Sequence, residues 1–306
     1  MKFITGLIFF VLSVTLQYFW IKLQRRIKLT QAQKTYGINI DVKIKSATPS
    51  MGGVIFLLLG FLALIIEFDL KNILFWSLPI FSGLIGFIDD FGKFRTHTSE
   101  GLTSLAKLKL QLMLCLVWVM LVNFYFGLNL WPGLEINSII NIFVAFIFSA
   151  GIINSVNIAD GLDGLAGGSF LISIMLSFIL IPLNEFNFKI LIELFFIVSG
   201  FLFFNLRPAK TFMGDTGSHF LGGALASVCI MNFKTLAIIP LGFIFIIEML
   251  SSGAQIIAIR KFHRKIFLMA PLHHHFQKMG YDESWITLRF WLVHIIFAGL
   301  LSLVLI

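Results

Sequence analysis

Two aspartates, Asp160 and Asp163, lie three positions apart in a glycine-containing stretch, Asn154–Gly168, between two strongly apolar runs. Residues three positions apart on a helix share a face, so the two carboxylates are predicted to point the same way. Asn154 and Asn157 continue the same spacing toward the amino terminus. Carboxylate and amide oxygens suit Mg²⁺, a hard cation, so the stretch predicts an oxygen-rich functional site rather than a plain turn.

Two further acidic motifs could join this site. Asp89 and Asp90 are adjacent at the end of an apolar run, and their mutual repulsion calls for a nearby cation, which Lys93 could supply one turn later. Asp215 lies in the Gly-Asp-Thr-Gly run that opens another apolar segment, where helix-start amides can hold an anion. A carboxylate beside an anion site suggests a metal-bridged phosphate, with simple helix capping as the alternative.

Three consecutive histidines, His273, His274 and His275, form the other polar cluster. Three adjacent side chains cannot all point the same way on a helix, so they make a poor single metal site but can donate hydrogen bonds to phosphate. Glu248 lies inside an apolar segment and is a candidate for a polar lining role.

The elements that position these residues are predicted to be membrane-spanning helices. The 306 residues are 58% hydrophobic and 12% charged, which indicates a polytopic, all-α membrane protein of about ten spans forming a single domain, 1–306. The two cysteines lie in apolar runs and are predicted to be small buried residues. The predicted spans cover about 3–21, 51–66, 73–88, 108–126, 138–153, 168–182, 188–205, 218–232, 236–258 and 286–306.

Basic residues fix the predicted orientation. Of the 23 Lys and Arg residues, 18 lie in or beside one alternate set of loops and four lie on the other side. By the positive-inside rule, the basic loops are cytoplasmic and both termini lie outside. All four polar motifs fall on the basic side, which predicts one active site on the cytoplasmic face. The net charge of +8 is explained in the same way, and no nucleic-acid-binding signature is present.

Acids, a magnesium ion, lysines and histidines at a membrane face suit the transfer of a phosphate-linked group to a lipid. In these motifs the chain resembles the polyprenyl-phosphate N-acetylhexosamine-1-phosphate transferases, and within them the phospho-N-acetylmuramoyl-pentapeptide transferase branch. The motifs are spread from about residue 45 to residue 290 and comprise Thr48–Gly53, Asp89-Asp90-x-x-Lys93, Asn154-x-x-Asn157-x-x-Asp160-Gly-Leu-Asp163-Gly-Leu, Phe212–Ser218 and Pro271–Phe276.

The resemblance implies a dimeric enzyme of the bacterial inner (cytoplasmic) membrane that requires Mg²⁺. Its reaction would transfer phospho-MurNAc-pentapeptide from UDP-MurNAc-pentapeptide to undecaprenyl phosphate, releasing UMP and forming lipid I for peptidoglycan. By motif match, Asp215 would be the magnesium ligand, and Asp89 and Asp90 the base or acceptor-orienting pair. Asp163 and His274 are also assigned to catalysis. The implied substrate-binding residues are Lys45, Lys93, Lys107, Asn157, Asp160, Asn205, Phe212, Gln255, His273 and His275, with Asn205 and Phe212 at the uridine.

Other interpretations stay open at this point. Residues 30–47 depart from the family pattern. The resemblance therefore supports the assigned role of Lys45 less strongly than the roles of the other residues. An N-acetylglucosamine-1-phosphate transferase with another donor is the second interpretation, although the three consecutive histidines favour the muramoyl-pentapeptide branch. A transporter would place its acids near the middle of the membrane instead of at one face. Direct transfer and a two-step route through an aspartyl-phosphate are both compatible with the sequence.

Overall fold

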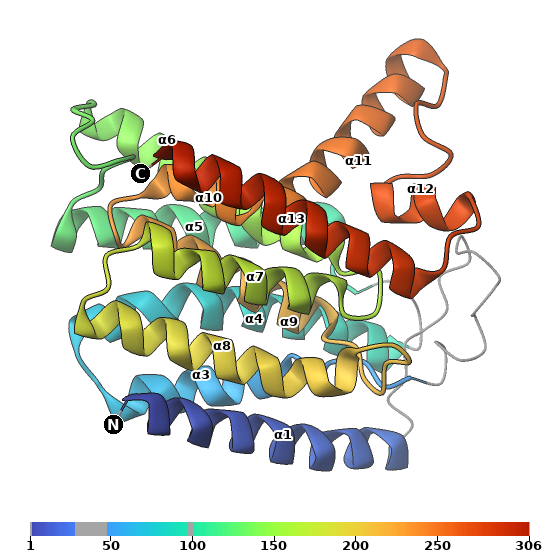
Figure 1. Ribbon diagram of the computed structural model, residues 1–306, viewed down its shortest axis with the longest axis horizontal. Coiled ribbons are helices and arrows are strands. Elements are labelled where there is room, and N and C mark those ends of the chain that lie inside the picture. The colour runs from blue at the N-terminus through green and yellow to red at the C-terminus, as the bar shows by residue number, and fades with distance from the viewer. Residues whose placement is uncertain (1, 28–47, 97–100, 306) are drawn as a thin grey trace.

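A computed structural model describes residues 2–27, 48–96 and 101–305 of the chain. Every regular element among them is helical, which confirms the all-α prediction (Figure 1). The helices are α1 (Lys2–Arg26), α3 (Val54–Ile66), α4 (Leu70–Thr96), α5 (Ser104–Phe126), α6 (Ser138–Ala159), α7 (Leu165–Leu180), α8 (Glu185–Asn205), α9 (Gly214–Ile230), η1 (Thr235–Ala237), α10 (Ile238–Leu241), α11 (Phe243–Phe262), α12 (Leu272–Lys278) and α13 (Glu283–Leu305).

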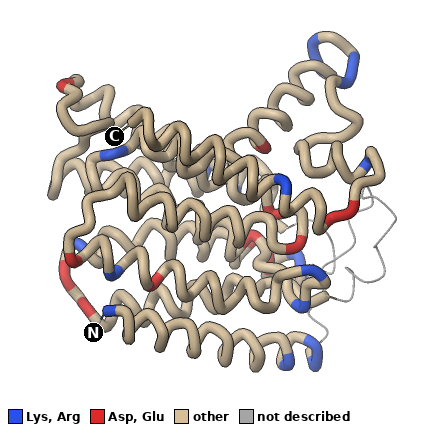
Figure 2. Tube along the Cα trace, viewed as in Figure 1, with Lys and Arg blue, Asp and Glu red and all other residues tan. Residues whose placement is uncertain are grey.

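Seven helices in the described part of the chain are long and apolar enough to cross a membrane: α1, α4, α5, α6, α8, α11 and α13. Two shorter apolar helices, α3 and α7, lie among them. Large apolar side chains are exposed along the outer helices, as lipid contact requires, and charged residues gather toward the ends of the bundle (Figure 2). Helix α1 begins and α13 ends at one end of the molecule, whereas α12 lies at the other (Figure 1).

Helix α9 is the centre of the bundle and contacts α3, α4, α6, α7 and α10. All of its residues from Thr216 to Ile230 are buried. Small residues permit this packing: a Cβ added at Gly53 of the segment before α3 would lie 2.2 Å from the backbone of Gly217. A glycine at position 53 is therefore needed for the close approach of this segment to α9.

The prediction of one continuous span over 236–258 is wrong, because three helical elements occupy this segment. Residues 235–241 form η1 and the one-turn helix α10, and α11 starts at Phe243, after Gly242. Pro240 has no amide hydrogen to donate to the preceding turn, so a continuous helix loses a bond there. The far half of α11 then projects away from the other helices (Figure 1).

The two cysteines behave as predicted. Cys115 on α5 and Cys229 on α9 are both buried and neither forms a disulfide. Their environment is the apolar core that α4, α6, α8 and α9 share. Both pack as small apolar residues of this core.

Candidate active site

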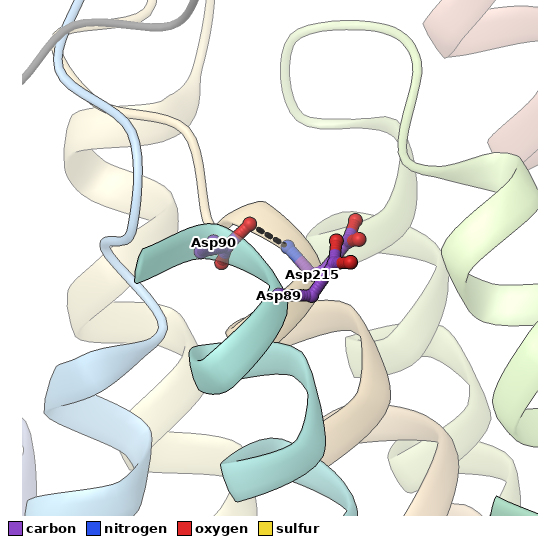
Figure 3. A group of neighbouring side chains, drawn as sticks. All are labelled: Asp89, Asp90 and Asp215. Carbon is purple, nitrogen blue, oxygen red and sulfur yellow. Dashed lines mark hydrogen bonds between the residues drawn. The ribbon is translucent and has the colours of Figure 1, made fainter. Parts of the chain in front are cut away.

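Three carboxylates meet where α4 and α9 cross. Asp89 and Asp90 come from α4 and Asp215 from the first turn of α9, and one oxygen from each lies within 4.8 Å of the others (Figure 3). Asp89 and Asp90 are buried and Asp215 is half-buried. Like charges held this close repel one another unless cations lie between them. The sequence motifs 125 positions apart are thus parts of one anionic site.

Two lysines supply that positive charge. Lys93 Nζ lies 2.5 Å from Asp89 Oδ2 and 2.9 Å from Asp215 Oδ2. Lys107, from the first turns of α5, places its Nζ 2.8 Å from Asp215 Oδ2 and 3.7 Å from Asp89 Oδ2. The expectation that Lys93 neutralises the adjacent aspartates is confirmed. Three carboxylates and two ammonium groups still leave a formal charge of −1, which favours a further cation.

Asp90 differs from its neighbour because it caps α9. Its carboxylate accepts hydrogen bonds from the Asp215 amide (3.2 Å), the Thr216 amide (2.9 Å) and the Thr216 hydroxyl (2.7 Å). A negative group at a helix start is stabilised by the unpaired amides and the helix dipole. Gly214 is required beside it, because its φ is +71° and a Cβ would lie 2.5 Å from Asp90 Oδ2. Asp90 therefore holds the turn that presents Asp215.

Asn157 donates a further hydrogen bond to the Asp215 carboxylate, whereas Asn154 does not contact the three aspartates. Asn157 Nδ2 on α6 donates to Asp215 Oδ1 and to Ser218 Oγ, both at 2.9 Å. Asn154 Nδ2 instead donates to Gln111 Oε1 (3.0 Å), whose Nε2 lies 2.8 Å from His219 Nε2. The predicted single set of oxygens from both asparagines and both following aspartates is not formed.

The prediction that Asp160 and Asp163 share a helical face is also wrong. Helix α6 ends at Ala159, and residues 160–164 form a turn that closes at Gly164 with φ +76°. Neither aspartate joins the three-carboxylate group. Asp163 Oδ2 accepts a hydrogen bond from the Ala209 amide (3.0 Å) instead. Glycines adjacent to both aspartates end the helical spacing, which is why the extrapolated periodicity failed.

Of the two residues expected at the uridine, Asn205 lies beside this turn, whereas Phe212 contacts the segment before α3. Asn205 ends α8, is buried, and accepts a hydrogen bond from the Gly164 amide (3.1 Å) while donating to the Thr211 carbonyl (2.9 Å). Phe212 is fixed by its backbone, which donates to Pro49 and accepts from Gly52. The structure thus brings Asp163, Asn205 and the segment 206–211 together. Lys45 lies outside the described residues.

The three histidines occupy α12 and have different hydrogen-bond partners, although the rings of His273 and His274 are in contact, with centroids 4.2 Å apart. His273 is buried: its amide donates to Glu248 Oε1 (3.2 Å) and its Nδ1 lies 3.2 Å from Glu248 Oε2. His274 Nδ1 lies 2.8 Å from Gln277 Oε1. His275 Nδ1 accepts from the Leu268 amide (3.1 Å). Only His274 and His275 retain partial exposure and can meet a substrate directly.

Gln255, which was expected to bind substrate, is engaged by the loop between α11 and α12. Its Oε1 accepts from the amides of Ile266 and Phe267, both at 3.0 Å, and its Nε2 donates to the Phe267 carbonyl (3.0 Å). It is buried. In this arrangement the carboxamide of Gln255 shapes the loop that leads to the histidines.

Gly161 leaves room for the close contact between α12 and the turn after α6, and its substitution gives a testable prediction. A Cβ on Gly161 would lie 2.2 Å from His273 Nε2, and that imidazole is held by buried Glu248. We expect Gly161→Ala to displace α12 at a cost of about 1–3 kcal/mol and to lower turnover about tenfold. Steady-state rates and melting temperature measure this. Gly253→Ala, where a Cβ meets no atom within 4 Å, is the control and should behave as wild type.

Comparisons with known proteins find two family models that match this chain. A family model described as "Glycosyl transferase family 4" matches residues 72–233, more than half of the chain. A second model, "Phospho-N-acetylmuramoyl-pentapeptide-transferase signature 1", matches residues 45–57.

Full-length relatives carry the same description. The chain is 37% identical over 296 residues to the phospho-N-acetylmuramoyl-pentapeptide-transferase of Dictyoglomus turgidum, covering 94% of this chain and 92% of the relative. It is 36% identical over 318 residues to that of Staphylococcus aureus strain MW2, covering 99% and 98%. For Caulobacter vibrioides the identity is 34% over 313 residues, covering 89% and 84%.

Proposed function

Because the chain belongs to the phospho-N-acetylmuramoyl-pentapeptide transferase family, we propose that it transfers phospho-MurNAc-pentapeptide from UDP-MurNAc-pentapeptide to undecaprenyl phosphate. The products are lipid I, a precursor of peptidoglycan, and UMP. The observation that carries this proposal is the group of Asp89, Asp90 and Asp215 bridged by Lys93 and Lys107. It provides both a cation site and phosphate-binding ammonium groups at one place.

The donor set fits Mg²⁺. Three carboxylates with oxygens within 4.8 Å and a formal excess of one negative charge match the all-oxygen coordination that this ion prefers. Asp215 and Asp89 are the proposed ligands, because the Oδ2 atom of each contacts side-chain ammonium groups, which can turn toward substrate phosphate. Both oxygens of Asp90 are instead held by two backbone amides and a hydroxyl. The bound ion would offset the charge between an anionic donor and an anionic acceptor.

The residues of the chain then divide the remaining tasks. An oxygen of the lipid phosphate attacks the β-phosphorus of the donor, the bond from that phosphorus to the bridging oxygen breaks, and UMP leaves with that oxygen. Lys93 and Lys107 bind phosphate oxygens, and Asp89 orients the acceptor phosphate or takes its proton. His274 and His275 donate to the sugar-phosphate, and Asn205 and Phe212 hold the uridine.

Direct transfer is preferred to an aspartyl-phosphate route. Both oxygens of Asp89 are engaged, Oδ1 by the Leu102 amide (2.8 Å) and Oδ2 by Lys93. Both oxygens of Asp215 are likewise engaged, by Asn157 and the two lysines. An aspartyl-phosphate route would need one of these oxygens as the nucleophile, whereas direct transfer needs them only as partners of the lysines and ligands of the cation. A phosphorylated enzyme trapped from labelled donor without lipid would contradict direct transfer.

The proposed function is tested by turnover of the purified protein in lipid nanodiscs. We expect UMP and labelled lipid product to form from UDP-MurNAc-pentapeptide and undecaprenyl phosphate. Chelation of Mg²⁺ should lower the rate at least about a hundredfold, and added Mg²⁺ should restore it. The alternative donor is UDP-GlcNAc. Its use in place of the muramoyl donor would assign the chain to N-acetylglucosamine-1-phosphate transfer instead.

We also propose a topology of ten spans in the bacterial inner membrane, with both termini outside and the active site on the cytoplasmic face. Helix α9 and the shorter α3 and α7 would complete the set of spans, because partner helices cover much of their surface. Lys and Arg are concentrated at the end of the bundle at which α12 lies (Figure 2). A homodimer is proposed from the resemblance alone, and light scattering in detergent would show its mass.

Labelling of single cysteines tests the orientation. Glu135→Cys, between α5 and α6, should react with a membrane-impermeant maleimide on intact cells, whereas Lys265→Cys should react only after permeabilisation. The native Cys115 and Cys229 are buried and need not be removed. The reverse pattern of reaction would invert the proposed orientation.

A further inference from the structure

Glu283 lies in no motif of the sequence, yet its buried carboxylate joins two separate parts of the site. It opens α13 and is 4% exposed. Its Oε1 accepts a hydrogen bond from the Asp163 amide (2.7 Å), and its Oε2 accepts one from Arg207 Nη1 (3.0 Å). A carboxylate buried this deeply is stable only where charged or amide partners satisfy it, as they do here.

Side chains on one face of α13 form hydrogen bonds with the turn after α6. Residues 283, 287 and 291 are four apart and therefore lie in one row along the helix. The Thr287 hydroxyl donates to the Asp163 carbonyl (3.2 Å), and Trp291 Nε1 donates to the Leu165 carbonyl (3.4 Å). Both the amide and the carbonyl of Asp163 are thus bonded to side chains of α13. This fixes the peptide groups on both sides of Asp163 and hence the direction of its side chain.

The direction of Asp163 sets the next segment in turn. Its carboxylate accepts from the Ala209 amide (3.0 Å), and the adjacent Gly164 amide donates to Asn205 Oδ1 (3.1 Å). Arg207, the partner of Glu283, lies in the same segment between α8 and α9. Glu283 therefore stands where the α6–α7 turn, the α8–α9 connection and α13 meet.

We propose that Glu283 is a positioning residue for the nucleotide end of the donor site, acting through Asp163 and the segment 205–212. This rests on the proposed function, which places the uridine at Asn205 and Phe212. The three-carboxylate group is held by α4, α5 and α9 and shares none of the contacts of Glu283 described above. Loss of Glu283 therefore weakens binding of the donor and of UMP, but leaves the lipid acceptor and the dependence on Mg²⁺ unchanged.

The test compares Glu283→Ala, Glu283→Gln and Thr287→Val with wild type. The measurements are equilibrium binding of labelled UMP, KM for each substrate, kcat, the Mg²⁺ dependence and the melting temperature. Glu283→Ala should weaken UMP binding and raise the donor KM at least about tenfold, with a lipid KM within twofold of wild type. Glu283→Gln keeps an acceptor for the Asp163 amide and should recover much of the loss. Thr287→Val should act in the same direction, about threefold.

The neighbouring Asp282 supplies a matched control. It also pairs with Arg207, at 3.4 Å, but its side chain is exposed and its oxygen caps Ser284. Asp282→Asn keeps the cap and should leave UMP binding unchanged. If it weakens UMP binding as Glu283→Ala does, pairing with Arg207 rather than contact with Asp163 is responsible, and the inference fails.

Other outcomes are equally decisive. Equal changes in both KM values, or a Glu283→Gln variant as impaired as Glu283→Ala, would contradict the inference. If Glu283→Ala does not fold, Glu283→Gln and Thr287→Val carry the same comparison. Wild-type protein that binds UMP but makes no lipid product would refute the proposed function alone, because the variants still report on the nucleotide site. Normal wild-type turnover with unaffected variants would refute the inference alone.

Discussion

Asp215→Asn is expected to lower the rate of lipid-linked product formation about a thousandfold, which corresponds to about 4 kcal/mol of transition-state stabilisation. The Asp215 carboxylate receives Lys93 and Lys107 on one oxygen and Asn157 on the other. A carboxamide carries no charge for a cation and would turn either its amide group or a weaker oxygen toward those partners. Product formation from labelled donor, at saturating Mg²⁺, measures the loss.

The control for this substitution is Asp69→Asn at the other end of the bundle. Asp69 precedes α4 and accepts from the Asn72 amide (2.9 Å), a bond that asparagine can keep. It should change turnover less than twofold. Folded Asp215→Asn protein that retains a tenth of wild-type activity would remove Asp215 from the proposed metal site.

The second large effect is expected from Gly86→Ala, which acts on the packing that assembles the site. A Cβ at this position of α4 would lie 2.2 Å from the Asp215 carbonyl oxygen and 2.4 Å from its carbonyl carbon. These are backbone atoms and cannot move aside, so α9 must shift away from α4. We expect a stability loss of about 1–3 kcal/mol and a rate at least about a hundredfold lower, because Asp215 leaves Asp89 and Asp90.

Gly151→Ala on α6 is the matched control for Gly86→Ala. A Cβ there meets no atom within 4 Å, and alanine favours a helix over glycine by about 1 kcal/mol. It should be as active as wild type and at least as stable. A Gly86→Ala protein within threefold of wild-type activity would show that the close approach of α4 and α9 does not set the geometry of the carboxylates.

Some of this arrangement could be predicted from sequence because the signals were local. Continuous apolar runs gave the all-helical fold, and the adjacent Asp89 and Asp90 with Lys93 one turn later gave an ion pair within a single helix. The end of the helical spacing after Ala159 could not be predicted in this way. Asp160 and Asp163 continue the spacing of Asn154 and Asn157, yet the glycines among them end α6 and turn the chain.

The remaining contacts depend on tertiary packing, which spacing cannot convey. Lys107 meets Asp215 across 108 positions and Glu283 meets Asp163 across 120. Nothing near Glu283 distinguishes it from an ordinary acidic residue in the first turn of a helix, where the dipole favours one. The division between Asn157 and Asn154 is of the same kind, since Asn157 contacts Asp215 and Ser218 of α9 and Asn154 contacts Gln111 of α5.

The burial of α9 has a consequence for how this helix is kept in the membrane. From Thr216 to Ile230 its surface is covered by protein, so little of it partitions into hydrocarbon. Its small residues, such as Gly222 and Gly223, come within contact of the backbones of α6 and α4. The free energy that retains α9 therefore comes from close packing between helices rather than from transfer into lipid. Because α9 does not need side chains that are soluble in lipid, its sequence can begin with Gly-Asp-Thr-Gly. The Asp215 carboxylate can then lie inside the bundle.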